Sequence, residues 1–171
     1  MVRCGTAPWL GSVLWRVMPP TCLPPGFTWS TMVPELLVSD LDASLRFWCG
    51  LCGFTVAYDR PEDRFAYLDR AGRQVMLEEA MAPGRRWITA PLERPFGRGV
   101  NFQITVCDTA PILASLDAAG WPLFLALEET WYRAGASKTG VRQFVVQDPD
   151  GYLVRFSQGL GLRPAMTSDL L

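Results

Sequence analysis

The chain has 171 residues, 49% of them hydrophobic, and its 16 basic and 17 acidic side chains give a formal net charge of -1. This length suits one domain that buries a core without disulfides or metals. The charge balance gives no electrostatic footprint for nucleic acid or for an anionic membrane. The five cysteines form no even framework, which indicates a reducing setting. We therefore expect a cytoplasmic protein whose partners are neither nucleic acids nor membranes.

Residues 1–31 differ from the rest of the chain. Two Pro-Pro pairs punctuate them, and no strand or helix period runs through them. The apolar run over 7–17 is too short to span a bilayer, and no convincing cleavage site follows it, so a signal peptide is the less favoured alternative. We expect 1–31 to be a disordered extension, or translation to start at Met32.

The first structural unit follows this extension. A strand pattern over 35–38 leads into an apolar period over 41–52, which predicts a helix that ends at Gly53. Two strand-like runs, 65–68 and 75–77, come next and are separated by a turn. With a strand that begins after Gly53, the unit is one strand, one helix and three strands.

The same order recurs in the second half of the chain. A strand pattern over 103–106 leads into a helical period over 110–119 that ends at Gly120, and strand-like runs cover 141–147 and 153–157. An internal repeat of this kind outranks any single motif as a guide to architecture. The sequence therefore predicts two copies of a β-α-β-β-β unit.

Two long segments between these elements are expected to be loops. The connector 80–99 carries prolines, glycines and four arginines, which is typical of a solvated loop, although two arginines and Trp87 could reach over a cleft. The segment 128–140 holds Trp131 and Tyr132. Because loops on a rigid scaffold often carry binding groups, we expect these aromatic side chains to contact a ligand.

Alternation within the strands predicts a sheet with one apolar and one polar face. In the first strand of the second unit, Phe102 and Ile104 fall on one face, and Asn101, Gln103 and Thr105 fall on the other. The later strands divide in the same way. A sheet that packs helices on one face and curves around a wet cleft on the other requires this pattern.

The sequence contains no histidine. An imidazole-based metal site and a histidine-dependent serine or cysteine nucleophile are therefore excluded. Cys49 and Cys52 lie in the predicted first helix, not at its N-terminus, so we interpret them as packing residues and not as a redox pair or a zinc site. Oxygen ligands for Mg²⁺ or Mn²⁺ remain as an alternative.

The repeat and three motifs resemble the vicinal oxygen chelate superfamily, which includes glyoxalases, extradiol dioxygenases, fosfomycin-modifying enzymes and bleomycin-resistance proteins. The motifs are the stretch 34–41, Phe47-Trp48 followed by 51–54, and 148–152. The resemblance covers about residues 32–158 and is closest to the bleomycin-resistance-like members. It implies an α+β fold in which two tandem βαβββ modules form a curved mixed sheet around a cleft, assembled as a homodimer.

The resemblance also sets the expected domain bounds. We expect one vicinal oxygen chelate domain over 32–159, made of module one (32–80), a connector (81–98) and module two (99–159). A C-terminal tail over 160–171 follows it.

Enzymes of this superfamily bind a divalent metal with side chains from the first and last strands of both modules. The matching positions here are Val33, Leu77, Asn101 and Arg155, with Glu78 replacing Leu77 if the register shifts by one residue. Valine and leucine cannot ligate a metal, arginine donates hydrogen bonds, and an asparagine amide is a weak ligand. We therefore expect no metal and no cofactor.

The favoured function is that of a metal-free small-molecule-binding protein of the bleomycin-resistance-like type, which sequesters an aromatic drug or metabolite and has no catalytic residues. The alternative is a glyoxalase- or lyase-like enzyme with an atypical oxygen-ligand or metal-free site. Arg155 either holds an anionic ligand group or pairs with Glu35 or Glu78. The expected ligand-binding residues are Glu35, Trp87, Asn101, Gln103, Trp131, Tyr132 and Arg155.

Overall fold

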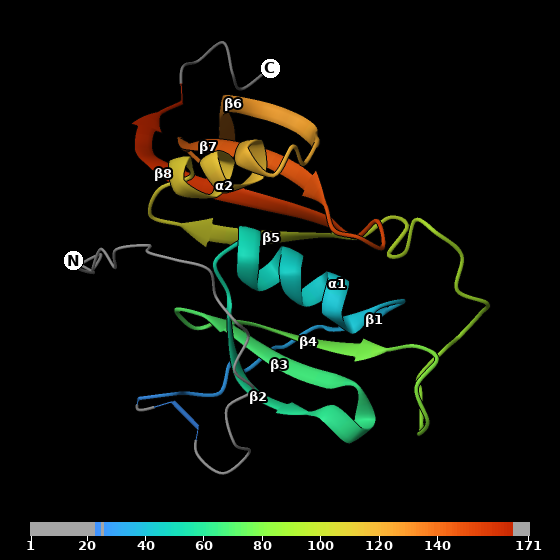
Figure 1. Cartoon of the computed structure of the whole chain (residues 1–171). Coiled ribbons are helices and arrows are strands. Elements are labelled where there is room, and N and C mark those ends of the chain that lie inside the picture. Colours follow the sequence, from blue (N-terminus) through green and yellow to red (C-terminus); the bar gives the residue numbers. More distant parts are fainter. Residues whose placement is uncertain (1–22, 25, 166–171) are drawn as a thin grey trace.

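The computed structural model describes residues 23, 24 and 26–165. Figure 1 shows two successive modules. Module one consists of β1 (Glu35–Val38), α1 (Leu41–Leu45), η1 (Arg46–Leu51), β2 (Thr55–Arg60), η2 (Pro61–Asp63), β3 (Phe65–Arg70) and β4 (Arg73–Glu79). Module two consists of β5 (Asn101–Val106), α2 (Ala110–Ala118), β6 (Leu123–Ala134), β7 (Ser137–Gln147) and β8 (Leu153–Pro164). The predicted α+β class and the repeated β-α-β-β-β order are confirmed.

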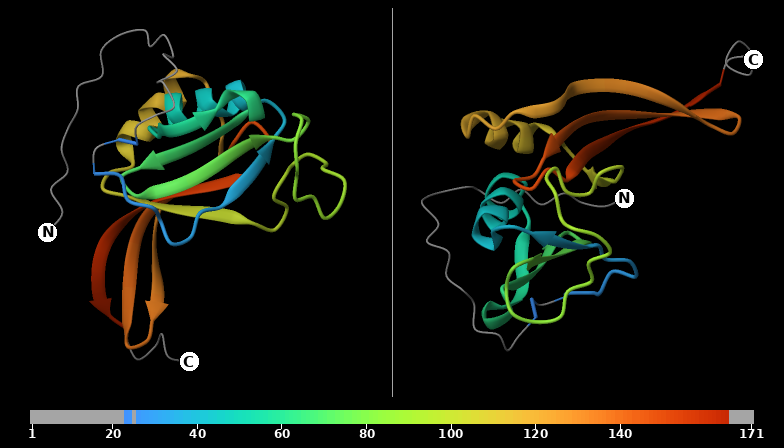
Figure 2. Two further views of the ribbon diagram at one scale, coloured as in Figure 1. Left: turned by 90° about the horizontal axis from the view of Figure 1, so that it is seen from below. Right: turned by 90° about the vertical axis from the view of Figure 1, so that its right-hand side faces the viewer.

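Each module forms one four-stranded mixed sheet, with the strand order β1-β4-β3-β2 in the first and β5-β8-β7-β6 in the second. The first strand of each module pairs in parallel with the last, and the remaining pairs are antiparallel. Figure 2 shows that α1 and α2 lie on the same side of the two sheets. The opposite side of each sheet, here called the open face, carries no helix.

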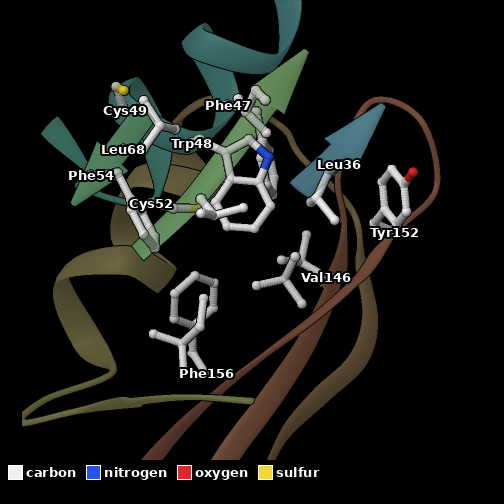
Figure 3. Packing of buried hydrophobic residues seen from close by; sticks show 14 of the residues in the cluster. Leu36, Phe47, Trp48, Cys49, Cys52, Phe54, Leu68, Val146, Tyr152 and Phe156 are labelled. Atoms are coloured by element: carbon white, nitrogen blue, oxygen red, sulfur yellow. The ribbon is translucent and has the colours of Figure 1, made fainter. Parts of the chain in front are cut away.

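One hydrophobic core joins the helix-covered faces of both modules. Trp48 of η1 lies among Leu36 of module one and Val146 and Phe156 of module two, as Figure 3 shows. These side chains are almost fully buried, and burial on this scale is the main stabilising contribution to the fold.

The two cysteines of the first helical segment belong to this core. Burial raises the pKa of the Cys49 thiol to about 12 and raises that of Cys52 as well. A thiol that stays protonated is neither a good nucleophile nor a metal ligand. Their surroundings therefore agree with a packing role.

The turn between β7 and β8 ties the modules together. The buried Asp150 carboxylate accepts hydrogen bonds from the Ser39 amide and from Arg94 of the connector. The Tyr152 hydroxyl donates to the carbonyl of Leu37 at 3.1 Å. The motif that carried part of the family resemblance thus holds the start of module one against module two.

The segment 128–140 is not a loop, and this expectation was wrong. β6 and β7 pair through it from Glu128↔Gln143 to Ala134↔Ser137, so only two residues form the turn. β8 continues to Pro164 beside β7, and the expected tail is therefore strand over 160–164, while 166–171 lie outside the described residues. Figure 2 shows the three strands projecting as an arm. The glycines of these strands suggested breaks, but backbone pairing carries the strands past them.

The last residues of the expected N-terminal extension pack on module one. Phe27 and Trp29 contact the Tyr67 ring edge to face, with centroids 6.0 and 5.3 Å away. The buried Gln74 side chain accepts a hydrogen bond from the Ser30 amide at 2.7 Å and donates one to the Thr28 carbonyl at 2.8 Å. Residues 26–31 are thus part of the folded domain, whereas 1–22 lie outside the described residues.

In the described part of the chain, no helix is long and apolar enough to cross a bilayer.

Candidate ligand-binding site

A pocket of about 300 Å³ lies on the open face of module two. Strands β5, β6, β7 and β8 all contribute to it, because alternate residues of each strand point to this face. Its lining residues are Asn101, Phe124, Leu125, Glu128, Tyr132, Gln143, Val145, Leu153 and Arg155. The pocket thus combines an apolar wall with a few polar groups, which is the usual composition of a small-molecule site.

A hydrogen-bond network fixes the polar side of this pocket. The buried Gln143 amide nitrogen donates to a Glu128 carboxylate oxygen and to the Tyr132 hydroxyl oxygen, both at 2.8 Å. Thr130 donates to the same Glu128 oxygen at 3.2 Å. Because the Tyr132 oxygen accepts from Gln143, its own proton is free to be donated to a bound molecule.

Arg155 is the cationic group of the pocket. Within the described part of the chain, its Nε is buried and has no hydrogen-bond partner. Buried polar atoms are almost always hydrogen-bonded, and an orphaned donor costs about 1 to 3 kcal/mol. A guanidinium in this position is therefore ready to donate to an acceptor that enters the pocket.

The expected alternative for Arg155, an ion pair with Glu35 or Glu78, is not what the structure shows. Glu78 pairs with Arg86 of the connector at 2.9 Å, and both side chains are almost fully buried. Burial raises the pKa of Glu78, and a hydrogen bond with Glu35 raises it further. The carboxylates of module one thus have their own partners.

The structure brings three of the predicted ligand-binding residues together: Asn101, Tyr132 and Arg155 all line the pocket. Gln103 lies opposite Arg155 in the β5–β8 register, so it shares the open face without lining the pocket. Glu35 lies in module one, where it is exposed at the start of β1.

The two predicted tryptophans are not pocket residues. Trp131 neighbours Tyr132 in β6 and therefore points to the opposite face of the sheet. There it packs over Gly140, and the Arg163 guanidinium stacks on its ring at 4.1 Å. Trp87 is 71% exposed in the connector, with the Arg85 guanidinium over its ring at 3.8 Å.

Sequence reasoning missed most of the apolar wall and the acidic member of the site. Gln143 was recognisable as a polar position in an alternating strand. Phe124, Leu125 and Glu128 were not, because irregular pairing of β6 with β7 between Leu123 and Glu128 breaks the alternation that assigns faces.

The open face of module one is filled by the chain itself. Phe65, Tyr67 and Ala57 are buried there, and Phe27 and Val33 pack against them. This arrangement also fixes the register of β4: Leu77 is in the main core, and Glu78 lies on the open face. The position that matches the family's ligand is therefore Glu78, one residue from the first assignment.

The four positions do not fit a divalent metal. Val33 offers a hydrocarbon, Glu78 is neutralised by Arg86, Asn101 offers a neutral amide, and Arg155 is itself a cation. Among the described residues, no three histidine, cysteine or acidic side chains gather where they could hold a metal ion. No chemistry at this site can be routed through such an ion.

The fold and the site define a protein built from paired βαβββ modules with a ligand-sized pocket on an open sheet face. The model of the Glyoxalase/Bleomycin resistance protein/Dioxygenase superfamily matches residues 31–156, and the chain belongs to this superfamily. The comparison with curated proteins found no match.

Solved structures of the same kind are similar to this chain. A superfamily member from Vibrio splendidus 12B01 is 39% identical over 74% of this chain and 95% of its own, with a TM-score of 0.34. TioX from Micromonospora sp. ML1 is 25% identical over 77% of this chain and 99% of its own, with a TM-score of 0.61. A superfamily protein from Alicyclobacillus acidocaldarius is 19% identical over 76% and 91%, with a TM-score of 0.52.

Proposed function

We propose that this protein is a metal-free binding protein that holds a small aromatic molecule bearing an anionic group in the pocket of module two. The observation that carries the proposal is Arg155, whose buried Nε has no partner among the described residues although it lines a pocket. A bound carboxylate, sulfonate or enolate would satisfy this donor, and hydrogen bonds to charged groups are the stronger ones.

The apolar wall supports an aromatic body for the ligand. Phe124 is 62% exposed and Leu125 is 37% exposed, which leaves their faces free for contact. Val145 and Leu153 continue this surface toward Arg155. Flat rings pack well on such a wall because they bury a large area with little loss of conformational entropy.

Binding is favoured over acid-base catalysis by the position of the carboxylates. Glu35 and Glu78 hydrogen-bond to each other in module one, and Arg86 covers Glu78. The pocket itself holds Glu128 as its one carboxylate among the residues that the structure describes. We therefore propose sequestration of an aromatic drug or metabolite, as in the bleomycin-resistance-like members.

We further propose that the protein is a homodimer. The strand β6 is the outer strand of its sheet and exposes Leu123, Phe124, Leu125 and Leu127. Exposed apolar groups on an unpaired strand favour association. Sedimentation that showed only monomer at micromolar concentration would contradict this proposal.

The binding function is tested with naphthylpropionate, which joins an aromatic body to one carboxylate. Isothermal titration calorimetry should show one site per pocket, and Arg155→Ala should weaken binding by about 1.5 to 3 kcal/mol. Arg142→Ala is the matched control, because Arg142 pairs with Glu129 at 2.6 Å outside this pocket. Equal affinity in the native protein and in Arg155→Ala would contradict the proposal, as would stoichiometric metal in the purified protein.

A further inference from the structure

We infer that the ligand of this pocket is zwitterionic, with a basic group beside its anionic group. This inference rests on the proposed binding function and names the chemical class of molecule that the site takes. It starts from Glu128, a carboxylate that the sequence alone did not identify and that lines the same pocket as Arg155.

Glu128 is held in place but not neutralised. One carboxylate oxygen, Oε1, accepts hydrogen bonds from Thr130 and Gln143, which are both uncharged. Within the described residues, no arginine or lysine forms an ion pair with Glu128, and its Oε2 accepts no hydrogen bond. A partly buried carboxylate that is positioned yet uncompensated is suited to bind a cation or a hydrogen-bond donor.

Arg155 and Glu128 thus offer opposite charges in one pocket without pairing with each other. The structure holds them apart because Gln143 ties Glu128 to β7 and Tyr132, while Arg155 extends from β8. A ligand that carries both charges can satisfy both groups at once. A ligand that carries only a carboxylate meets Arg155 favourably but brings its charge close to Glu128, and like charges in a confined site repel.

The network also sets the direction of the ligand. The Tyr132 hydroxyl proton is free to donate, since its oxygen accepts from Gln143, and it therefore favours the anionic end together with Arg155. The free Oε2 of Glu128 is left for the basic end. The aromatic body then lies on the wall formed by Phe124 and Leu125.

The test compares three probes that share one naphthalene body: naphthylpropionate with a carboxylate, naphthylethylamine with an amine, and naphthylalanine with both. Calorimetry on the native protein should show naphthylalanine binding about tenfold more tightly than naphthylpropionate, the ratio expected from one added hydrogen bond between charged groups. Naphthylethylamine should bind most weakly, because Arg155 repels it.

Glu128→Gln removes the charge while an amide oxygen can still accept from Gln143. This variant should lose the tenfold preference and bind naphthylalanine and naphthylpropionate about equally. Glu129→Gln is the matched control, because the neighbouring carboxylate pairs with Arg142 and does not line the pocket. The control should keep the preference of the native protein.

The outcomes separate the inference from the function on which it rests. If naphthylpropionate binds in an Arg155-dependent way but naphthylalanine binds no better, or if Glu128→Gln leaves the preference intact, the zwitterion inference is overturned and the binding function stands. If none of the three probes binds at millimolar concentration, the proposed binding function itself is contradicted.

Discussion

Glu78 of β4 and Arg86 of the connector form an ion pair of 2.9 Å in which both side chains are almost fully buried. Arg86 also donates to the backbone carbonyl of Glu79 at 3.1 Å. This contact anchors the connector to module one, and it leaves Arg155 of module two without the carboxylate partners that the sequence offered. The pair closes one open face and keeps the other available.

Arg86→Ala should lower the free energy of unfolding by about 3 kcal/mol at pH 7, because it leaves a buried carboxylate unpaired. Burial already raises the pKa of Glu78, and loss of Arg86 would raise it more. A carboxyl group with a raised folded-state pKa contributes most stability while it is protonated, and this contribution is lost as the pH rises. The loss caused by Arg86→Ala should therefore be smaller at pH 4 than at pH 7 in urea unfolding. Arg85→Ala, which removes an exposed neighbour, is the control, and equal losses in the two variants would disprove the prediction.

Asp148→Asn should remove part of the pH dependence of stability. Burial is the largest cause that raises the pKa of Asp148 to about 6, against hydrogen bonds from the Tyr152 and Asp150 amides that lower it. With its folded-state pKa above the unfolded value, Asp148 stabilises the fold below pH 4 and loses this contribution by about pH 6 to 7. The native protein should lose about 2 to 3 kcal/mol from this group over that window, and Asp148→Asn should not. Parallel curves of melting temperature against pH would contradict the assignment.

Gln74→Ala should release residues 26–31 from module one. The Gln74 side chain accepts from the Ser30 amide and the Tyr67 hydroxyl and donates to the Thr28 carbonyl. Loss of these bonds leaves polar groups unsatisfied and should cost about 1 to 3 kcal/mol of stability. Hydrogen exchange at the Ser30 amide should become fast in the variant. Gln103→Ala is the control because that side chain is exposed, and unchanged protection at Ser30 in Gln74→Ala would refute the prediction.

Gly140→Ala should disturb Trp131 without disturbing the pocket. A Cβ at Gly140 would lie 2.7 Å from the Trp131 ring, which is closer than real contacts allow. Displacement of the ring should cost about 1 to 3 kcal/mol of stability, while affinity for naphthylpropionate stays unchanged because Trp131 is on the other face. Gly159→Ala is the control, since a Cβ there meets no atom within 4 Å. Weaker ligand binding in Gly140→Ala would show that Trp131 does belong to the site.

Local patterns were enough to predict the modules and the polarity of the sheet faces. Ile104 and Val106 are buried while Asn101, Gln103 and Thr105 are exposed, as alternation in β5 indicated. This information lies in neighbouring residues, because strand and helix periods act over a few positions and burial of the apolar face is the dominant stabilising term.

The sequence by itself therefore determined the repeat, the apolar and polar faces, and the absence of any imidazole chemistry. Tertiary structure alone decided the rest: that the strands of the arm continue through 128–140, that Phe27 and Trp29 cover module one, and that Glu78 pairs with Arg86. The physical reason is that these outcomes depend on contacts between segments far apart in the chain, whose register and partner choice no local period encodes. The same dependence on distant contacts leaves Arg155 and Glu128 as two unpaired charges in one pocket.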